Sequence, residues 1–129
     1  MTYLLDTSIV IEVLRERRHF ENIVSHEIAL PIHVHYEIMV GIERSRTPEL
    51  KSKKRHQYSA LLECCRVVPY ESAHAERAAV ERARLEARGE MIGPIDLLIA
   101  AQALELNGTL VSKNLREFIR VEGLSVISW

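Results

Sequence analysis

The sequence lacks the features that mark secreted or membrane-bound chains. It has only two cysteines, Cys64 and Cys65, and because they are adjacent in the chain they provide neither a disulfide framework nor a thiolate metal site. No apolar run approaches the ~20 residues that a membrane span needs. Residues 1–6 have no basic segment and reach an acid at once, unlike a signal peptide. These absences favour the reducing cytoplasm and no membrane association.

The sequence also lacks a large excess of either charge, since its formal net charge is −1. This excludes a globally polybasic nucleic-acid-binding chain. One stretch, residues 44–57, departs from the balance, with six basic residues against the single acid Glu49. Such a stretch is either a solvated helix face or a contact surface for a polyanion. The basic residues are Arg44, Arg46, Lys51, Lys53, Lys54 and Arg55.

The chain has 129 residues, of which 47% are apolar, and it shows no repeat or linker. It is therefore expected to form one domain, residues 1–129. The patterning predicts strands at residues 2–5, 28–31, 66–69, 109–111 and 124–127. It predicts helices from Asp6 to the turn at 15–18 and at residues 20–25, 33–45, 49–65, 71–88, 93–106 and 114–118. Short strands that alternate with helices predict a layered α/β domain with a mainly parallel sheet.

Two helices carry further expectations. In segment 33–45, Val34, Ile38 and Ile42 share one face, and Gly41 is expected to allow close packing. In segment 49–65, the apolar stripe of Tyr58, Leu61, Leu62 and Cys65 is narrow. A narrow stripe is more typical of a projecting arm or a dimer contact than of a core helix. We therefore expect a helical arm at about residues 48–65.

The segment Gly93-Pro94-Ile95-Asp96 reads as a helix start. Proline suits the first helical position, where its missing N–H costs nothing. With Gly93 as the N-cap, Asp96 falls at the third helical position. An acid there either stabilises the helix dipole or belongs to a site.

Four carboxylates are expected at one edge of the sheet, because sites in open parallel sheets form at the carboxyl ends of the strands. Asp6 follows the first strand, Glu37 lies early in the helix after the second, Asp96 opens its helix, and Glu117 follows the fourth strand. Each acid has a plain structural alternative, such as a helix cap or a surface position. If they converge, oxygen ligands without His or Cys suit Mg²⁺ or Mn²⁺. Such an ion polarises a phosphoryl oxygen and lowers the pKa of an attacking water.

At these residues the sequence resembles the PIN-domain endoribonucleases, in four motifs that run in order along nearly the whole chain. The motifs are Leu5-Asp6-Thr7-Ser8, Tyr36-Glu37-Ile38-Met39-Val40-Gly41, residues 92–100 and residues 110–118. The closing Val121-Glu122-Gly123-Leu124 and Trp129 resemble the tails of VapC-type toxins from bacterial toxin–antitoxin pairs.

The resemblance implies a PIN-like three-layer α/β/α fold and a Mg²⁺-dependent ribonuclease toxin, with Mn²⁺ as the alternative ion. It implies a cytoplasmic protein that forms a homodimer and a hetero-oligomer with a VapB-type antitoxin. Asp6 and Asp96 carry over as metal ligands and Glu37 as the third acid. At the fourth position relatives often have aspartate, and either Glu117 or Asn114 fills it here.

The implied reaction is hydrolysis of an RNA phosphodiester, in tRNA or mRNA, by a metal-activated water. Thr7 and Ser8 are placed to orient Asp6, and Ser112 stands where relatives often have threonine; a structural role is expected for all three. The histidines share no ligand spacing with the acids and are assigned no catalysis. The candidate RNA contacts are Arg46, Lys51, Lys53, Lys54 and Arg55. Two other classes stay open: a metal-dependent phosphoesterase acting on another substrate, and a non-catalytic binding module of the same fold.

Overall fold

A five-stranded parallel sheet forms the centre of the computed structural model, which describes residues 1–129. The strand order is β3-β2-β1-β4-β5, and all four neighbouring pairs are parallel. The chain winds outward from β1 in both directions, so the strand order changes direction between β1 and β4. The strands are β1 (Thr2–Leu5), β2 (Glu27–Pro31), β3 (Arg66–Val68), β4 (Thr109–Val111) and β5 (Ser125–Ile127).

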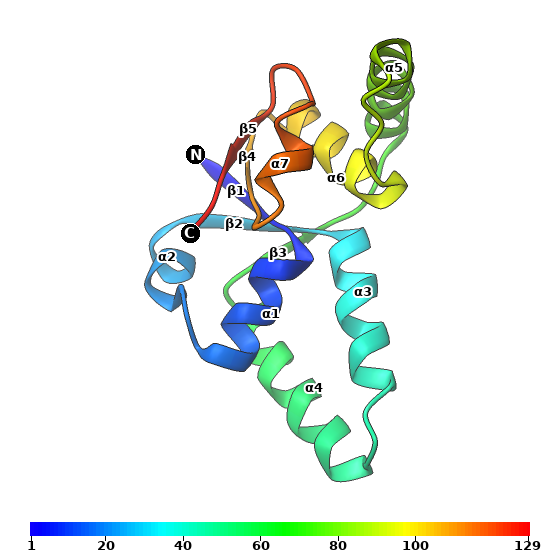
Figure 1. Cartoon of the computed structure of the whole chain (residues 1–129). Coiled ribbons are helices and arrows are strands. Elements are labelled where there is room, and N and C mark those ends of the chain that lie inside the picture. Colours follow the sequence, from blue (N-terminus) through cyan, green and yellow to red (C-terminus); the bar gives the residue numbers. More distant parts are fainter.

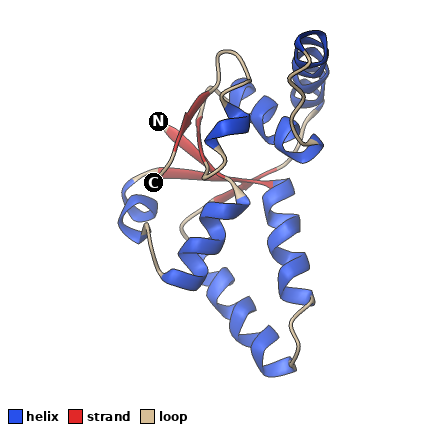
Figure 2. Ribbon diagram, viewed as in Figure 1, coloured by secondary structure: helices blue, strands red, loops and turns tan.

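Helices cover both faces of this sheet, which gives the predicted three layers. In Figures 1 and 2, α1 to α4 lie below the sheet, and α5 and α6 lie above it. Helices α5 and α6 pack against each other. The helices are α1 (Thr7–Glu16), α2 (Phe20–Ser25), α3 (Ile32–Glu43), α4 (Pro48–Leu62), α5 (Ser72–Arg88), α6 (Pro94–Glu105) and α7 (Leu115–Phe118). None of them has both the length and the hydrophobicity that a membrane span requires.

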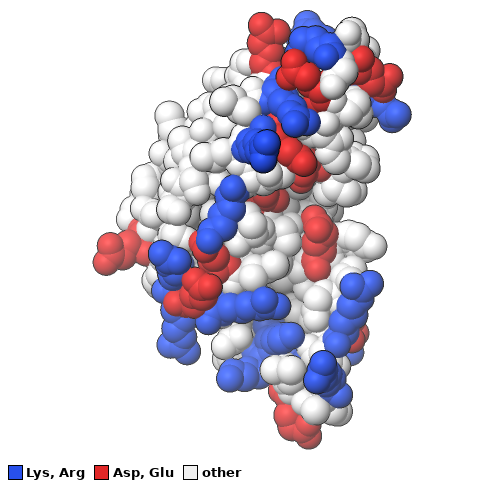
Figure 3. All heavy atoms as spheres, in the orientation of Figure 1, with Lys and Arg blue, Asp and Glu red and all other residues white.

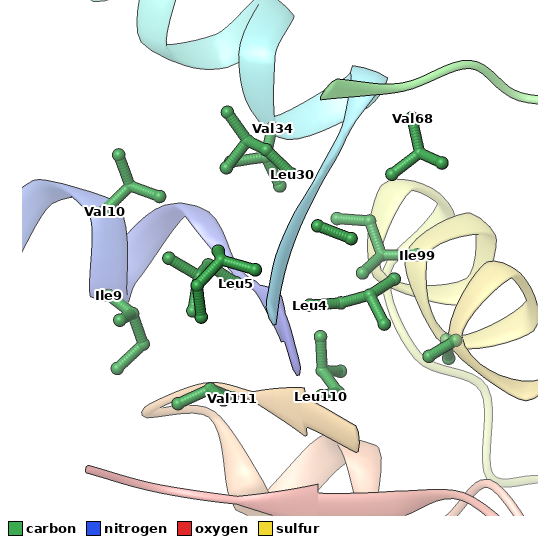
Figure 4. Close-up of a cluster of buried hydrophobic side chains, with 14 of the residues drawn as sticks. Leu4, Leu5, Ile9, Val10, Leu30, Val34, Val68, Ile99, Leu110 and Val111 are labelled. Atoms are coloured by element: carbon green, nitrogen blue, oxygen red, sulfur yellow. The ribbon is translucent and has the colours of Figure 1, made fainter. Parts of the chain in front are cut away.

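The central strand is buried on both faces, as expected for a parallel sheet between helical layers. Leu4 and Leu5 have no exposed surface, and because side chains alternate along a strand they enter opposite layers. Figure 4 shows Leu5 beside Val10 of α1, and Leu4 toward Ile99 of α6. Burying one such side chain contributes about 1.5–3 kcal/mol. The two apolar layers therefore hold β1, and the residue after it, in a fixed position.

The predicted helical faces are confirmed in α3 and corrected in α4. Val34 and Ile38 are buried, as the spacing indicated. Helix α4 begins at Pro48, capped by the Thr47 hydroxyl, and its first half projects from the body of the molecule (Figure 1). The expectation that its apolar stripe avoids the core is wrong, because Tyr58 is only 2% exposed and its ring belongs to the core. The Tyr58 hydroxyl lies 2.7 Å from Nδ1 of His35, which satisfies its polar end.

Candidate functional site

Asp6 lies where the strand order changes direction, at the carboxyl ends of β1 and β4. Its backbone N–H donates to the carbonyl of Val111, so it continues the pairing of the two strands. Its side chain caps α1, with Oδ1 accepting the Thr7 N–H at 2.7 Å. Its Oδ2 accepts the Ser112 hydroxyl at 2.7 Å. This carboxylate is 7% exposed and is oriented entirely by neutral donors.

Asp96 enters the same region from α6. Gly93 is the N-cap and Pro94 the first helical residue, so Asp96 takes the predicted third position. The pKa of Asp96 is raised to about 6, mainly by burial. The negative charges of Asp6, Glu117 and Glu37 and a hydrogen bond with Glu117 contribute to the same increase. Asp96 therefore lies within electrostatic reach of the other three predicted carboxylates.

Glu37 lies in the second turn of α3, at the exposed side of this acidic cluster, which we define as Asp6, Glu37, Asp96 and Glu117. Its Oε1 accepts the Thr7 hydroxyl at 3.1 Å. Thr7 therefore contacts two of the acids, Asp6 through its backbone and Glu37 through its side chain. Ser8 follows Thr7 on α1 and does not orient Asp6 as predicted. Its hydroxyl instead accepts the Lys113 N–H.

Asn114 and Glu117 both reach the fourth corner of the cluster. The Asn114 side-chain amide donates to Glu117 Oε2 at 3.2 Å and contacts Asp96 Oδ2 at 3.5 Å. Its backbone N–H donates to the Ser112 hydroxyl. Glu117 thus supplies the acid at this corner, and Asn114 supplies a neutral donor between two acids.

The charge of the cluster has no counter-ion in the protein. None of the ion pairs in the structure includes any of the four acids. Grouped carboxylates are stable when they share a proton or a cation. No three His, Cys, Asp or Glu side chains lie close enough to form a finished metal shell. Carboxylate oxygens of this kind are ligands for a hard divalent cation, which can keep several of its waters and needs only one or two direct carboxylates.

The predicted basic residues divide into three groups. Lys53 and Lys54 line a groove between α1, α3 and α4 that also includes Thr7 and Glu37, so it leads to the cluster. Lys51 and Arg55 instead pair with Glu43 of α3. Arg46 is exposed in the turn between α3 and α4 and takes part in neither set of contacts. Figure 3 shows Lys and Arg side chains gathered on this lower half of the molecule.

Gly41 has a different role from the one predicted. A Cβ atom built on it meets nothing within 4 Å, so the residue does not mediate close packing. It lines the same groove beside Glu37. The absence of a side chain leaves the groove wider at this residue.

One ion pair beside the site, that of Glu12 with Lys113, was not predicted from the sequence. Lys113 lies between Ser112 and Asn114, both of which reach the cluster. A signal was present in the sequence, because Glu12 interrupts the apolar face formed by Ile9, Val10 and Val13. An acid buried on such a face is expected to be paired with a basic side chain.

Comparisons with known proteins identify what this arrangement is similar to. The PIN domain family matches residues 3–124 of the chain. Ribonuclease VapC2 of Haemophilus influenzae is 33% identical over 134 residues, and tRNA(fMet)-specific endonuclease VapC of Shigella flexneri is 28% identical over 133 residues. Each alignment covers 100% of this chain and 98% of the relative. The crystal structure of VapBC2 from Rickettsia felis, bound to a DNA fragment from its promoter, superposes with a TM-score of 0.91 at 27% identity. The match covers 100% of this chain and 99% of that one.

Proposed function

The chain belongs to the PIN domain family, and from this premise we propose that it is an endoribonuclease that hydrolyses RNA phosphodiesters. The observation that carries the proposal is the acidic cluster without a counter-ion at the carboxyl ends of β1 and β4. A non-catalytic module of this fold has no need for four acids in one place, since their repulsion only lowers its stability.

The four acids have separate roles in the proposed reaction. Asp6 and Asp96 would hold Mg²⁺, or Mn²⁺ in its place. When bound, the ion supplies a Lewis acid that polarises the phosphoryl oxygen and lowers the pKa of the attacking water. Glu37 and Glu117 accept hydrogen bonds from waters at the site and so orient them. Ser112 keeps Asp6 in place through its 2.7 Å hydrogen bond.

The relatives also support a toxin that a cognate antitoxin neutralises in the cytoplasm. VapBC complexes from Rickettsia felis and Salmonella typhimurium are similar to this chain over its whole length. We propose a VapB-type antitoxin as the partner, and a homodimer as the form of the free toxin. The groove beside Glu37 suits an acidic amphipathic segment of the antitoxin, because its apolar floor has a basic rim. The floor includes Ile11, Leu14, Ile38, Ile42 and Leu50, and the rim is Arg15, Lys53 and Lys54.

The proposed function is tested by incubating the purified chain with total RNA, single-stranded DNA and a generic phosphoester in Mg²⁺ buffer. We expect cleavage of RNA alone, with 5′-phosphate and 3′-hydroxyl ends, because water and not the RNA 2′-hydroxyl is the nucleophile. Cleavage of the phosphoester alone would favour the second class of enzyme. A 2′,3′-cyclic phosphate end, or no cleavage of any substrate, would contradict the proposal.

Lys53 and Lys54 are predicted to contact phosphates of the bound RNA. Replacing both by Gln should weaken RNA binding and reduce the slope of log affinity against log salt by about 0.7 for each phosphate that is no longer neutralised. Binding is measured in an Asp96→Asn background, so that the RNA stays intact. The matched control is the pair Arg66→Gln and Arg82→Gln, which removes the same charge from exposed positions away from the groove. Equal slopes in the two double variants would assign the lysines to a solvated surface.

A further inference from the structure

A buried carboxylate outside the acidic cluster contacts the loop that completes it. Glu12 lies on α1 and is only 6% exposed. Its Oε2 lies 2.7 Å from Nε2 of His19, and its Oε1 lies 3.8 Å from Arg18 and also binds the Lys113 ammonium. Of these three partners, only Lys113 belongs to the segment after β4. The Glu12–Lys113 pair therefore joins α1 to the loop that bears Ser112 and Asn114.

Helix α1 holds this loop at two points, both of them at Lys113. Ser8 and Glu12 are four residues apart and share one face of the helix. The Ser8 hydroxyl accepts the Lys113 N–H at 3.3 Å, and Glu12 binds the Lys113 side chain. Residue 113 is thus fixed in both its backbone and its side chain.

The residues on either side of Lys113 both contact the acids. Ser112 donates its hydroxyl to Asp6, and the Asn114 amide lies between Asp96 and Glu117. A shift of Lys113 would move both of these donors, since they are its direct neighbours in the chain. The same ion pair keeps the Lys113 ammonium at Glu12, so this cation does not neutralise the cluster.

We propose that Glu12 is a positioning residue for the acidic cluster, acting through Lys113 to fix Ser112 and Asn114. This inference rests on the proposed nuclease function of the cluster. The burial of Glu12 supports it, because a charge pair with a buried member is screened less by solvent than an exposed pair. The positioning effect requires both an acid on α1 and a lysine in the loop, and this chain has them at Glu12 and Lys113.

The kinetic test compares Glu12→Gln, Lys113→Gln and the double variant. Glu12→Gln keeps the size of the side chain but removes its charge, and should lower kcat about ten-fold, because small displacements of catalytic groups reduce rates by up to about 10²-fold. The KM for RNA should change less than about two-fold, since the groove lysines are untouched. The double variant should be no worse than either single one, because all three variants remove the same ion pair. Lys113→Arg retains the pair and should recover most of the activity.

The matched control is Arg18→Gln, which removes a cation next to Glu12 without touching the loop. It should cleave RNA at the parent rate. Additive losses in the double variant, or an equal loss in Arg18→Gln, would overturn the inference. So would parent-like kcat in Glu12→Gln.

Hydrogen exchange provides a readout that does not depend on cleavage. In Glu12→Gln the amides of Lys113 and Asn114 should exchange about ten-fold faster than in the parent, because local opening of the loop becomes easier. The amide of Leu4 in β1 serves as the internal reference. Unchanged exchange at residues 113 and 114 would overturn the inference whatever the activity. A parent chain that lacks nuclease activity would instead overturn the proposed function, with the exchange rates still deciding whether Glu12 holds the loop.

Discussion

Asp96→Asn is expected to lower RNA cleavage by about 10³-fold or more, and Asp6→Asn to have a similar effect. Each substitution removes one proposed metal ligand, and the bound ion contributes several kcal/mol to the stability of the transition state. The measurement is single-turnover cleavage at saturating RNA. Glu122→Gln is the matched control, because it removes an exposed carboxylate outside the cluster and should leave the rate unchanged. Parent-like cleavage by both aspartate variants would contradict the assignment of the site.

The same Asp96→Asn variant is expected to be more stable than the parent when EDTA removes divalent ions at pH 7. The pKa of Asp96 rises from its ordinary 3.8 to about 6 in the folded protein. The folded chain therefore binds this proton more tightly than the unfolded chain, and the parent loses stability as the pH rises from 4 through 6. After allowance for the partial exposure of Asp96, the gain in unfolding free energy at pH 7 is about 1 kcal/mol.

This gain should disappear toward pH 4, where Asp96 is protonated in the folded parent as well. Urea unfolding of the parent and the variant at several pH values provides the comparison. A difference that stays constant from pH 4 to pH 7 would attribute the gain to packing and not to removal of a buried charge that neighbouring acids repel. If Asp96→Asn loses cleavage while its stability is unchanged or increased, the role of Asp96 is functional and not structural.

Much of the site could be predicted because its aspartates are tied to local features. The chain has 18 acidic residues, and Asp6 and Asp96 are its only aspartates. One follows a buried strand and the other a Gly-Pro helix start, and each pattern fixes a position on the sheet before any tertiary contact is known. The parallel sheet followed from the alternation of short strands and helices. Topology allowed the four acids to converge, and the resemblance to PIN-domain endoribonucleases favoured this over their structural alternatives.

The remaining features depend on contacts between segments far apart in the chain. The narrow stripe of α4 indicated an arm, yet Tyr58 packs into the core and its hydroxyl contacts His35, 23 residues earlier. Ser8 was predicted to serve Asp6, but the direction of its side chain on α1 brings it to Lys113. Periodicity identifies which face of a helix is apolar, and it does not identify which polar groups meet across two elements.

Removal of divalent ions is expected to abolish cleavage by the unmodified chain. Excess EDTA should lower the rate to background, and Mg²⁺ in excess of the chelator should restore it. Thermal unfolding gives a second measurement, because an ion that binds only the folded state stabilises it by about 2.7 kcal/mol at 100 times its Kd. The Asp6→Asn and Asp96→Asn variants should lose most of this stabilisation. An equal Mg²⁺ effect on the parent and both variants would place the ion elsewhere.

Cleavage that survives in EDTA would require another source of acid–base catalysis, for which histidine is the usual side chain. The contacts of the histidines argue against it. His19 is bound to Glu12, His35 to Tyr58, and His74 to the backbone of α5 at its start. The pKa of His33 is affected by Glu37 of the cluster. Burial lowers this pKa more than the charge of Glu37 raises it. The His33 ring packs edge-on against Tyr70. These four histidines are therefore weaker candidates for the reaction than the acids of the cluster.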